Sequence, residues 1–329
     1  MKKFLAVLTA ICLSLPLFLL TGCRQEEKKD GKISVVTTIF PVYDWVNNIL
    51  GESADRVDLT LLLDNGIDLH SYRPSVEDLV KIAECDLFVY VGGESDAWAE
   101  DALKNAVNPD RRVLNLLDTL GDAAKEEETV DGMEGETHDD EDHDHDHDHE
   151  SEKDEHVWLS LRNAKVLCRA IENDLCAIDP ENAASYGENL RRYEEALSLL
   201  DTEYADAVRE GKKDVLLFAD RFPFRYLVDD YGLRYYAAFP GCSAETEASF
   251  ATIAFLTEKV DELHLSCVLT PEGSDRKVAE TVIAGTAEKN QRILALDSLQ
   301  GITSADAAGG VTYLSVMKKN LDVLKIALS

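Results

Sequence analysis

The stretch PENAASYGENLRRYEEALSLLDTEYADAVRE, residues 180–210, decides how the rest of the chain is arranged. Apolar and aromatic side chains recur along it at intervals of three or four residues: Tyr186, Leu190, Tyr193, Leu197 and Leu200. This spacing predicts one long amphipathic helix, and Pro180 suits its first turn. At 1.5 Å per residue the helix would span about 45 Å, roughly two small lobes end to end. We therefore expect it to link two lobes stiffly.

Short apolar segments alternate with helix-like segments on both sides of this stretch. The strand-like segments are 33–38, 56–63, 85–93 and 111–118 before it, and 213–220, 233–239, 265–272 and 292–297 after it. Such alternation is typical of parallel sheets covered by helices. The predicted fold class is therefore α/β, with two similar β/α lobes bridged by one long rigid helix. A helical segment at 310–328 closes the chain.

The N-terminus, MKKFLAVLTAICLSLPLFLLTGC, has the composition of a secretory signal. Two lysines precede an apolar run that is too short to span a membrane, which predicts a cleaved signal peptide over residues 1–22. The ending Leu-Thr-Gly-Cys resembles a bacterial lipobox, in which Cys23 would carry a lipid. Polar residues follow, so 23–31 is predicted to be a lipidated, flexible tether. The alternative is an ordinary signal with a chance cysteine.

The charge and the cysteines exclude several classes of protein. The formal net charge is −31, from 33 basic and 64 acidic residues, so nucleic acid is not an expected partner. An acidic exterior suits an extracytoplasmic protein and attracts cations. Five of the seven cysteines lie beyond the tether: Cys85, Cys168, Cys176, Cys242 and Cys267. Their odd number and the lack of a CxxC pair argue against a disulfide framework.

Residues 121–155 are almost free of apolar side chains, which predicts an unstructured acidic insertion into the first lobe. Its centre, HDDEDHDHDHDHE at 138–150, contains five histidines: His138, His143, His145, His147 and His149. Alternating histidine and aspartate offers many weak ligands without fixed geometry. We interpret this tract as an accessory, low-affinity metal loop; the alternative is an inert solvated loop.

Two other histidines lie in ordered surroundings. His70 follows the strand-like segment 56–63, and ligands of open α/β sheets bind outside the carboxyl ends of strands. His156, in DEHVWLS, lies where the acidic insertion ends and apolar sequence resumes. The apolar residues after His156 favour a firmly held side chain, although it could also be the last histidine of the tract.

Together, the lipobox, DLHSYRPS, the histidine-rich insertion, HVWLS, the long helix and the closing GVTYLSVMKKNLDVL resemble the metal-binding lipoproteins of bacterial zinc and manganese ABC importers. The resemblance covers essentially the whole mature chain. It implies one metal ion in the cleft between two lobes joined by a rigid helix. Its usual ligands are a histidine after the second strand, a histidine after the insertion, a histidine or glutamate in the second lobe, and a carboxylate near the C-terminus.

By this resemblance three ligands are His70, His156 and Asp297; alternatively, Asp297 only caps a turn. The position of the remaining ligand is occupied by Arg221, which cannot ligate a metal. Asp220 or a water molecule is the favoured replacement. Other replacements remain open: Cys242, Glu245, Glu247 and Glu272. Arg221 would then pair with a nearby carboxylate.

The resemblance implies an extracytoplasmic, high-affinity metal-binding lipoprotein, not an enzyme, that delivers Zn²⁺ to an ABC permease and its ATPase. Mn²⁺ is the second choice of ion, and a monomer anchored through Cys23 is expected. The lobes would comprise 32–120 with 156–179, and 211–329. One alternative is a secreted zinc-dependent hydrolase, although HExxH and a recognisable general base are missing. The other is a metal-storage or adhesin lipoprotein.

Overall fold

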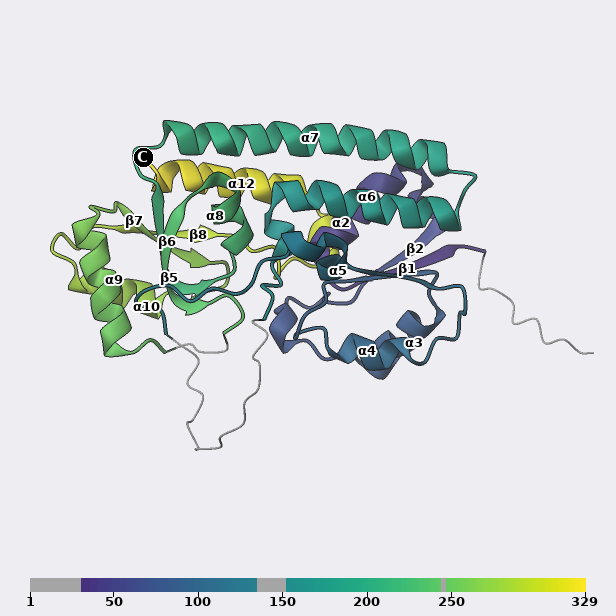
Figure 1. Cartoon of the computed structure of the whole chain (residues 1–329), viewed down its shortest axis with the longest axis horizontal. Coiled ribbons are helices and arrows are strands. Elements are labelled where there is room, and N and C mark those ends of the chain that lie inside the picture. Colours follow the sequence, from purple (N-terminus) through teal and green to yellow (C-terminus); the bar gives the residue numbers. More distant parts are fainter. Residues whose placement is uncertain (1–30, 135–151, 244–246) are drawn as a thin grey trace, which may run out of the picture. The chain divides into compact units, whose positions relative to one another are not determined.

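Two parallel four-stranded sheets organise the computed structural model, which describes residues 31–134, 152–243 and 247–329 (Figure 1). The first sheet has the order β2-β1-β3-β4, with β1 Ile33–Thr37, β2 Val57–Leu61, β3 Leu87–Tyr90 and β4 Arg112–Asn115. The second has the order β6-β5-β7-β8, with β5 Val215–Phe222, β6 Arg234–Pro240, β7 Cys267–Pro271 and β8 Arg292–Leu296. In both sheets the second strand of the lobe lies at one edge, next to the first strand. The third and fourth strands follow on the other side of the first. The predicted pair of similar α/β lobes is confirmed.

Helices connect the strands in both lobes. The first lobe contains α2 Phe40–Leu50, α3 Val76–Glu84, α4 Trp98–Leu103, α5 Leu116–Leu120 and α6 Leu161–Ile178, with short 3₁₀ turns at η2 Gly51–Arg56, η3 Leu69–Ser71, η4 Gly121–Ala123 and η5 Val157–Leu159. The second contains α8 Arg225–Tyr231, α9 Phe250–Glu262, α10 Lys277–Gly285, α11 Ser304–Ala308 and α12 Tyr313–Ala327. The inner strands β3 and β7 are buried at every position, as expected of parallel strands covered on both faces. No helix in the described part of the chain is both long and apolar enough to cross a membrane.

The long helix is α7, Ala183–Glu210, and it packs against elements of both lobes: α2, α6, α8 and α12 (Figure 1). Its buried residues follow the predicted spacing of three and four: Tyr186, Leu190, Tyr193, Leu197, Leu200, Tyr204 and Ala207. The helix begins three residues later than Pro180. Both Asn182 and Tyr186 donate to the Asp179 carboxylate, so the preceding residues close a turn instead.

The start of α12 forms a second connection between the lobes. The Tyr313 amide donates to Asp44 of α2 (3.1 Å), and the Tyr313 hydroxyl donates to the Trp158 carbonyl (2.7 Å). In return the Trp158 indole donates to the carbonyl of Ser298 beyond β8 (2.8 Å). These bonds are buried, where hydrogen bonds are strong and costly to break. They favour a fixed spacing of the lobes.

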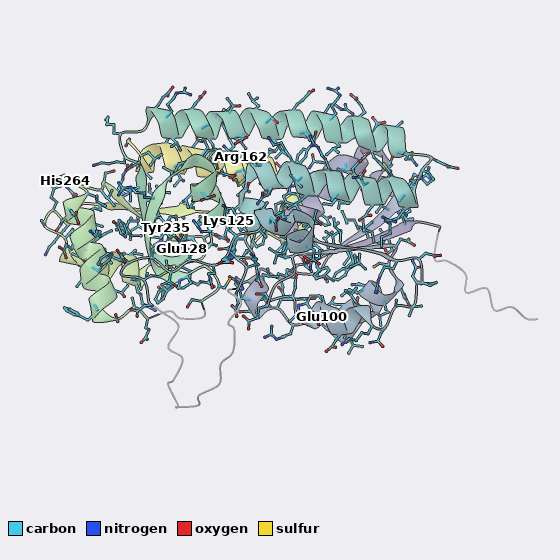
Figure 2. All side chains as sticks on the ribbon, in the orientation of Figure 1. Glu100, Lys125, Glu128, Arg162, Tyr235 and His264 are labelled. Atoms are coloured by element: carbon cyan, nitrogen blue, oxygen red, sulfur yellow. The ribbon has the colours of Figure 1, made fainter. Side chains whose placement is uncertain are left out.

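The flanks of the acidic insertion are packed, whereas the sequence predicts an unstructured segment over 121–155. Residues 124–134, which we call the strap, cross onto the second lobe. The Lys125 amide donates to the Tyr226 hydroxyl, the Tyr235 hydroxyl donates to Glu128, and the Glu134 amide donates to the Ala238 carbonyl (Figure 2). The returning arm pairs with the strap through main-chain bonds near Glu127 and Asp154. Main-chain pairing and these contacts replace the apolar burial that the composition lacks. Residues 138–150, the signal and Cys23 lie outside the described residues.

Candidate metal centre

His70 lies in the turn η3, beyond the carboxyl end of β2. The Asp68 carboxylate begins this turn by accepting a bond from the His70 amide (3.0 Å). The Nδ1 atom of the imidazole lies 2.6 Å from the Ser95 hydroxyl and 3.5 Å from Oε2 of Glu155. Acceptors on the Nδ1 side favour the tautomer that leaves Nε2 available as a ligand.

His156 directly precedes η5 and is fully buried. Oδ1 of Asp154 accepts bonds from its amide (2.9 Å) and from Nδ1 of its ring (3.1 Å). The Trp158 ring lies 5.3 Å away, centroid to centroid. A Cβ at Gly241 would come within 3.0 Å of the His156 ring, so the glycine allows the loop to lie against it. The ring is therefore held on several sides.

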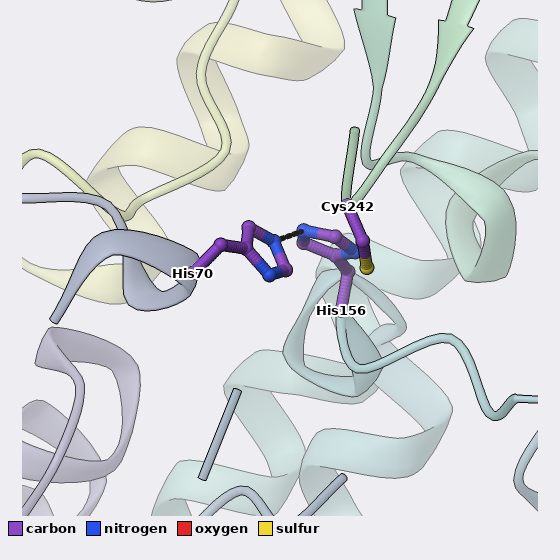
Figure 3. A group of neighbouring side chains, drawn as sticks. All are labelled: His70, His156 and Cys242. Carbon is purple, nitrogen blue, oxygen red and sulfur yellow. Dashed lines mark hydrogen bonds between the residues drawn. The ribbon is translucent and has the colours of Figure 1, made fainter. Parts of the chain in front are cut away.

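The two imidazoles face each other, with Nε2 of His70 3.3 Å from Nε2 of His156 (Figure 3). With a proton on each Nδ1, both Nε2 lone pairs face the space between the rings, where one ion would be held by both. Tetrahedral zinc with Zn–N bonds of about 2.0–2.1 Å places two ligand nitrogens about 3.4 Å apart. The observed separation suits one such ion.

Cys242 approaches this pair from the second lobe, in the loop after β6. Its sulfur and the ligand nitrogens of His70 and His156 all lie within 4.8 Å of one another (Figure 3). The Cys242 amide donates to Oε1 of Glu127 in the strap (3.3 Å). Among the described residues this is the group of three side chains with the proximity that a metal ion requires.

Asp297 and Asp220, both predicted ligands, make other contacts. Asp297 follows β8 and accepts a bond from the Leu299 amide (2.8 Å); its own amide donates to Oδ1 of Asn320 (2.8 Å). Burial and the nearby Glu272 carboxylate raise the pKa of Asp297 to about 6. Asp220 accepts bonds from the Arg221 amide and the Ser274 hydroxyl. Neither belongs to the group of three, and their ligand roles stay predictions.

Arg221 donates to Oδ2 of Asp68 (3.2 Å). Oδ1 of the same carboxylate lies 3.8 Å from Nε2 of His70. Arg221 thus places a positive charge beside the two histidines, which opposes a second cation there. Asp68 partly offsets that charge.

The electrostatic surroundings keep His70 neutral. Burial and the neighbouring His156 lower the pKa of His70 to about 4, with a further contribution from Arg221. Burial also lowers the pKa of His156, but the carboxylates of Asp154, Glu155 and Asp68 together more than offset this, so the net direction is upward. Burial, followed by the carboxylates of Glu127 and Asp154, raises the pKa of the Cys242 thiol. A neutral imidazole is the form that ligates metals.

Buried carboxylates surround the three side chains. Asp154 and Glu155 are each 2% exposed, and burial raises the pKa of Glu155. Oε1 of Glu155 accepts a bond from the Ser95 amide (2.8 Å), whereas Oε2 is buried with no hydrogen-bond partner among the described residues. Buried carboxylates without cationic partners are costly, and a divalent cation between the imidazoles would offset that cost.

Sequence reasoning identified His70 and His156 but not the residues that hold them. Asp154 and Glu155 are adjacent to His156 and could have been noticed as its acceptors. Ser95 lies 25 residues from His70 and carries no local signal. Cys242 was one of several residues that the sequence left open as the remaining ligand.

The fold and these side chains define a two-lobed binding protein in which two histidines and a cysteine come together where the lobes meet. The chain belongs to the family described as "Zinc-uptake complex component A periplasmic", whose profile matches residues 35–327. This confirms the resemblance found in the sequence. A family of uptake components consists of transport proteins rather than enzymes, as predicted.

Relatives and solved structures agree with this assignment. The chain is 31% identical over 332 residues to the zinc-binding lipoprotein AdcA of Streptococcus pneumoniae, a match that covers 99% of the chain and 61% of that relative's length. It is 31% identical over 305 residues to the high-affinity zinc uptake system protein ZnuA of Bacillus subtilis, covering 92% of the chain and 90% of the relative. The structure of the Zn(II)-bound ZnuA-like domain of S. pneumoniae AdcA has a TM-score of 0.68 at 28% identity, covering 91% of the chain and 99% of that domain.

Proposed function

We propose that this protein is an extracytoplasmic binding lipoprotein that captures Zn²⁺ and delivers it to an ABC permease and its ATPase. The observation that carries the proposal is the 3.3 Å separation of the two Nε2 atoms, each on an imidazole whose Nδ1 side faces an acceptor. Zinc is named as the metal of the AdcA and ZnuA relatives. Imidazole nitrogen is a ligand that zinc accepts readily.

Manganese is the less favoured ion because it prefers oxygen ligands, and the group of three ligand atoms within 4.8 Å of one another consists of two nitrogens and a sulfur. Asp297 and Asp220 remain predicted additional ligands. Either could reach the ion only by giving up contacts it makes in the structure. Water is the alternative in the remaining coordination position.

Cys23 is proposed to carry the lipid that holds the protein, as a monomer, on the outer face of the membrane. The relative named a lipoprotein in S. pneumoniae supports this anchor. The histidine-rich tract is proposed to gather zinc for the site. Its described flanks support that role, since Glu127 contacts Cys242 and Asp154 contacts His156.

Zinc titration with a competing chelator tests the proposal. The wild-type mature chain is compared with a chain lacking 137–150, a deletion that keeps Asp154, and with His70→Ala/His156→Ala in each background. One tight zinc equivalent should survive the deletion and disappear in the double variant. His264→Asn is the matched control, because His264 is exposed and asparagine tolerates its positive φ (Figure 2). Tight binding that persists without both histidines would overturn the proposal.

A further inference from the structure

The ends of β5 and β6 lie side by side in the second lobe. Arg221 pairs with Phe239, and Phe222 pairs with Pro240, so the loop that carries Cys242 leaves the sheet next to Arg221. The guanidinium of Arg221 is engaged with Asp68 and cannot accept a metal. The loop after β6 is the adjacent element that can supply a ligand from the second lobe in its place.

Cys242 is placed by contacts on both sides of its backbone. Its amide is bound by Glu127 of the strap. A Cβ at the preceding Gly241 would lie 2.9 Å from the Phe222 carbonyl and 3.0 Å from the His156 ring, closer than side-chain carbons normally approach. The glycine lets this loop lie against His156, and the sulfur lies within 4.8 Å of a ring nitrogen of each histidine.

Cys242 differs from the buried cysteines that act as small hydrophobic residues. Cys85, Cys168 and Cys267 lie in the apolar cores, and none belongs to a group of metal-ligating side chains among the described residues. Cys242 instead lies beside two imidazoles, with Glu127, Asp154 and Glu155 close enough to affect its ionisation. Simple core filling does not explain a cysteine in such polar company.

We propose that Cys242 ligates the transported ion as a thiolate, in the position that Arg221 leaves unfilled, and that its sulfur makes the site select thiophilic ions such as Zn²⁺ over Mn²⁺. The inference rests on the proposed function and specifies its ligand set. On binding, the S–H bond is replaced by a metal–sulfur bond and the proton passes to solvent, with no change of oxidation state. Thiolate ligands favour zinc, whereas manganese favours oxygen.

Cobalt substitution tests the sulfur directly, because a Co²⁺–thiolate bond gives a charge-transfer band in the near ultraviolet. The band is expected in the wild-type chain, absent in Cys242→Ser, and retained in Cys176→Ser, a matched control whose thiol contacts Glu172 instead. Zinc affinity of Cys242→Ser should fall by more than the roughly 10–100-fold that loss of an outer hydrogen-bond partner costs. Its Mn²⁺ affinity should change much less, so the Zn²⁺/Mn²⁺ preference should drop.

A rescue variant tests whether Cys242 fills the coordination position that a ligand at residue 221 would otherwise fill. Arg221→His added to Cys242→Ser should restore tight zinc binding without restoring the cobalt–thiolate band. Failure of this rescue in a folded protein would overturn the claim that the two residues serve one coordination position. A wild-type chain with no thiolate band, together with wild-type zinc affinity in Cys242→Ser, would overturn the inference. In that case the His70→Ala/His156→Ala titration still tests the proposed function separately.

Discussion

Replacing Asp154 with asparagine is expected to weaken zinc binding by about 10–100-fold without unfolding the protein. Oδ1 of Asp154 accepts bonds from the His156 amide (2.9 Å) and from its Nδ1 (3.1 Å), and the residue is 2% exposed. Asparagine keeps one acceptor oxygen, replaces the other oxygen with an NH₂ group of similar size and removes the negative charge. The variant therefore separates the charge of Asp154 from its position.

The magnitude follows from these contacts. A hydrogen bond to a charged group contributes about 1.5–3 kcal/mol, against about 0.5–1.5 for a neutral pair. The difference, about 1–1.5 kcal/mol, is close to one factor of ten in affinity. The attraction of a buried carboxylate for a divalent cation adds to this loss, since the interior screens charge less than water. Together, the weaker hydrogen bond and the lost attraction predict a decrease in zinc affinity of up to about 100-fold.

Chelator competition at fixed pH and ionic strength measures the effect, with Asp110→Asn as the control because Asp110 is an exposed aspartate. Nitrogen NMR of the imidazole reports whether the His156 tautomer changes. A loss below about threefold, with native circular dichroism, would refute the role assigned to Asp154. A loss beyond about 1000-fold would show that Asp154 ligates the ion itself.

Three further changes test other contacts. Ser95→Ala removes the hydroxyl 2.6 Å from Nδ1 of His70 and should lower zinc affinity about tenfold in the same titration; unchanged affinity would contradict that contact's role. Tyr313→Phe leaves the buried carbonyl of Trp158 without its donor and should lower the free energy of unfolding by about 1–3 kcal/mol in urea; an unchanged midpoint would count against it. Burial raises the pKa of Asp44 to about 6 from its usual 3.8, so the native state binds this proton more tightly than the unfolded chain. Its contribution to stability is present below about pH 4 and is lost as pH rises to about 6, by about 3 kcal/mol, so Asp44→Asn should flatten the pH profile of urea unfolding in that range. An identical slope of unfolding free energy against pH in the wild type and in Asp44→Asn would rule out this contribution of Asp44.

The fold was predictable because its signals are local. The alternation of strand-like and helix-like segments and the spacing of Tyr186, Leu190 and Tyr193 follow from the periodicities of strands and helices. Helix ends were less certain. The bonds from Asn182 and Tyr186 to Asp179 close a turn where Pro180 suggested a helix start, and those bonds depend on side-chain positions.

The flanks of the insertion show where composition misleads. Residues 121–134 look too polar to be ordered, but the strap gains main-chain pairing and hydrogen bonds with the hydroxyls of Tyr226 and Tyr235 in the second lobe. Those partners lie about a hundred residues away along the chain, with separations of 101 and 107. A composition argument about a local segment cannot include them.

Periodicity and short motifs were sufficient to predict two α/β lobes and the connecting helix, and the resemblance carried by local motifs singled out His70 and His156, because each of these signals lies among neighbours in the chain. The third member of the site was not encoded locally. Cys242 lies 86 residues beyond His156, and its sulfur reaches the imidazoles only because β6 ends beside β5 and Gly241 allows close approach. Coordination depends on distances of a few ångströms between side chains, and packing of the two lobes sets those distances.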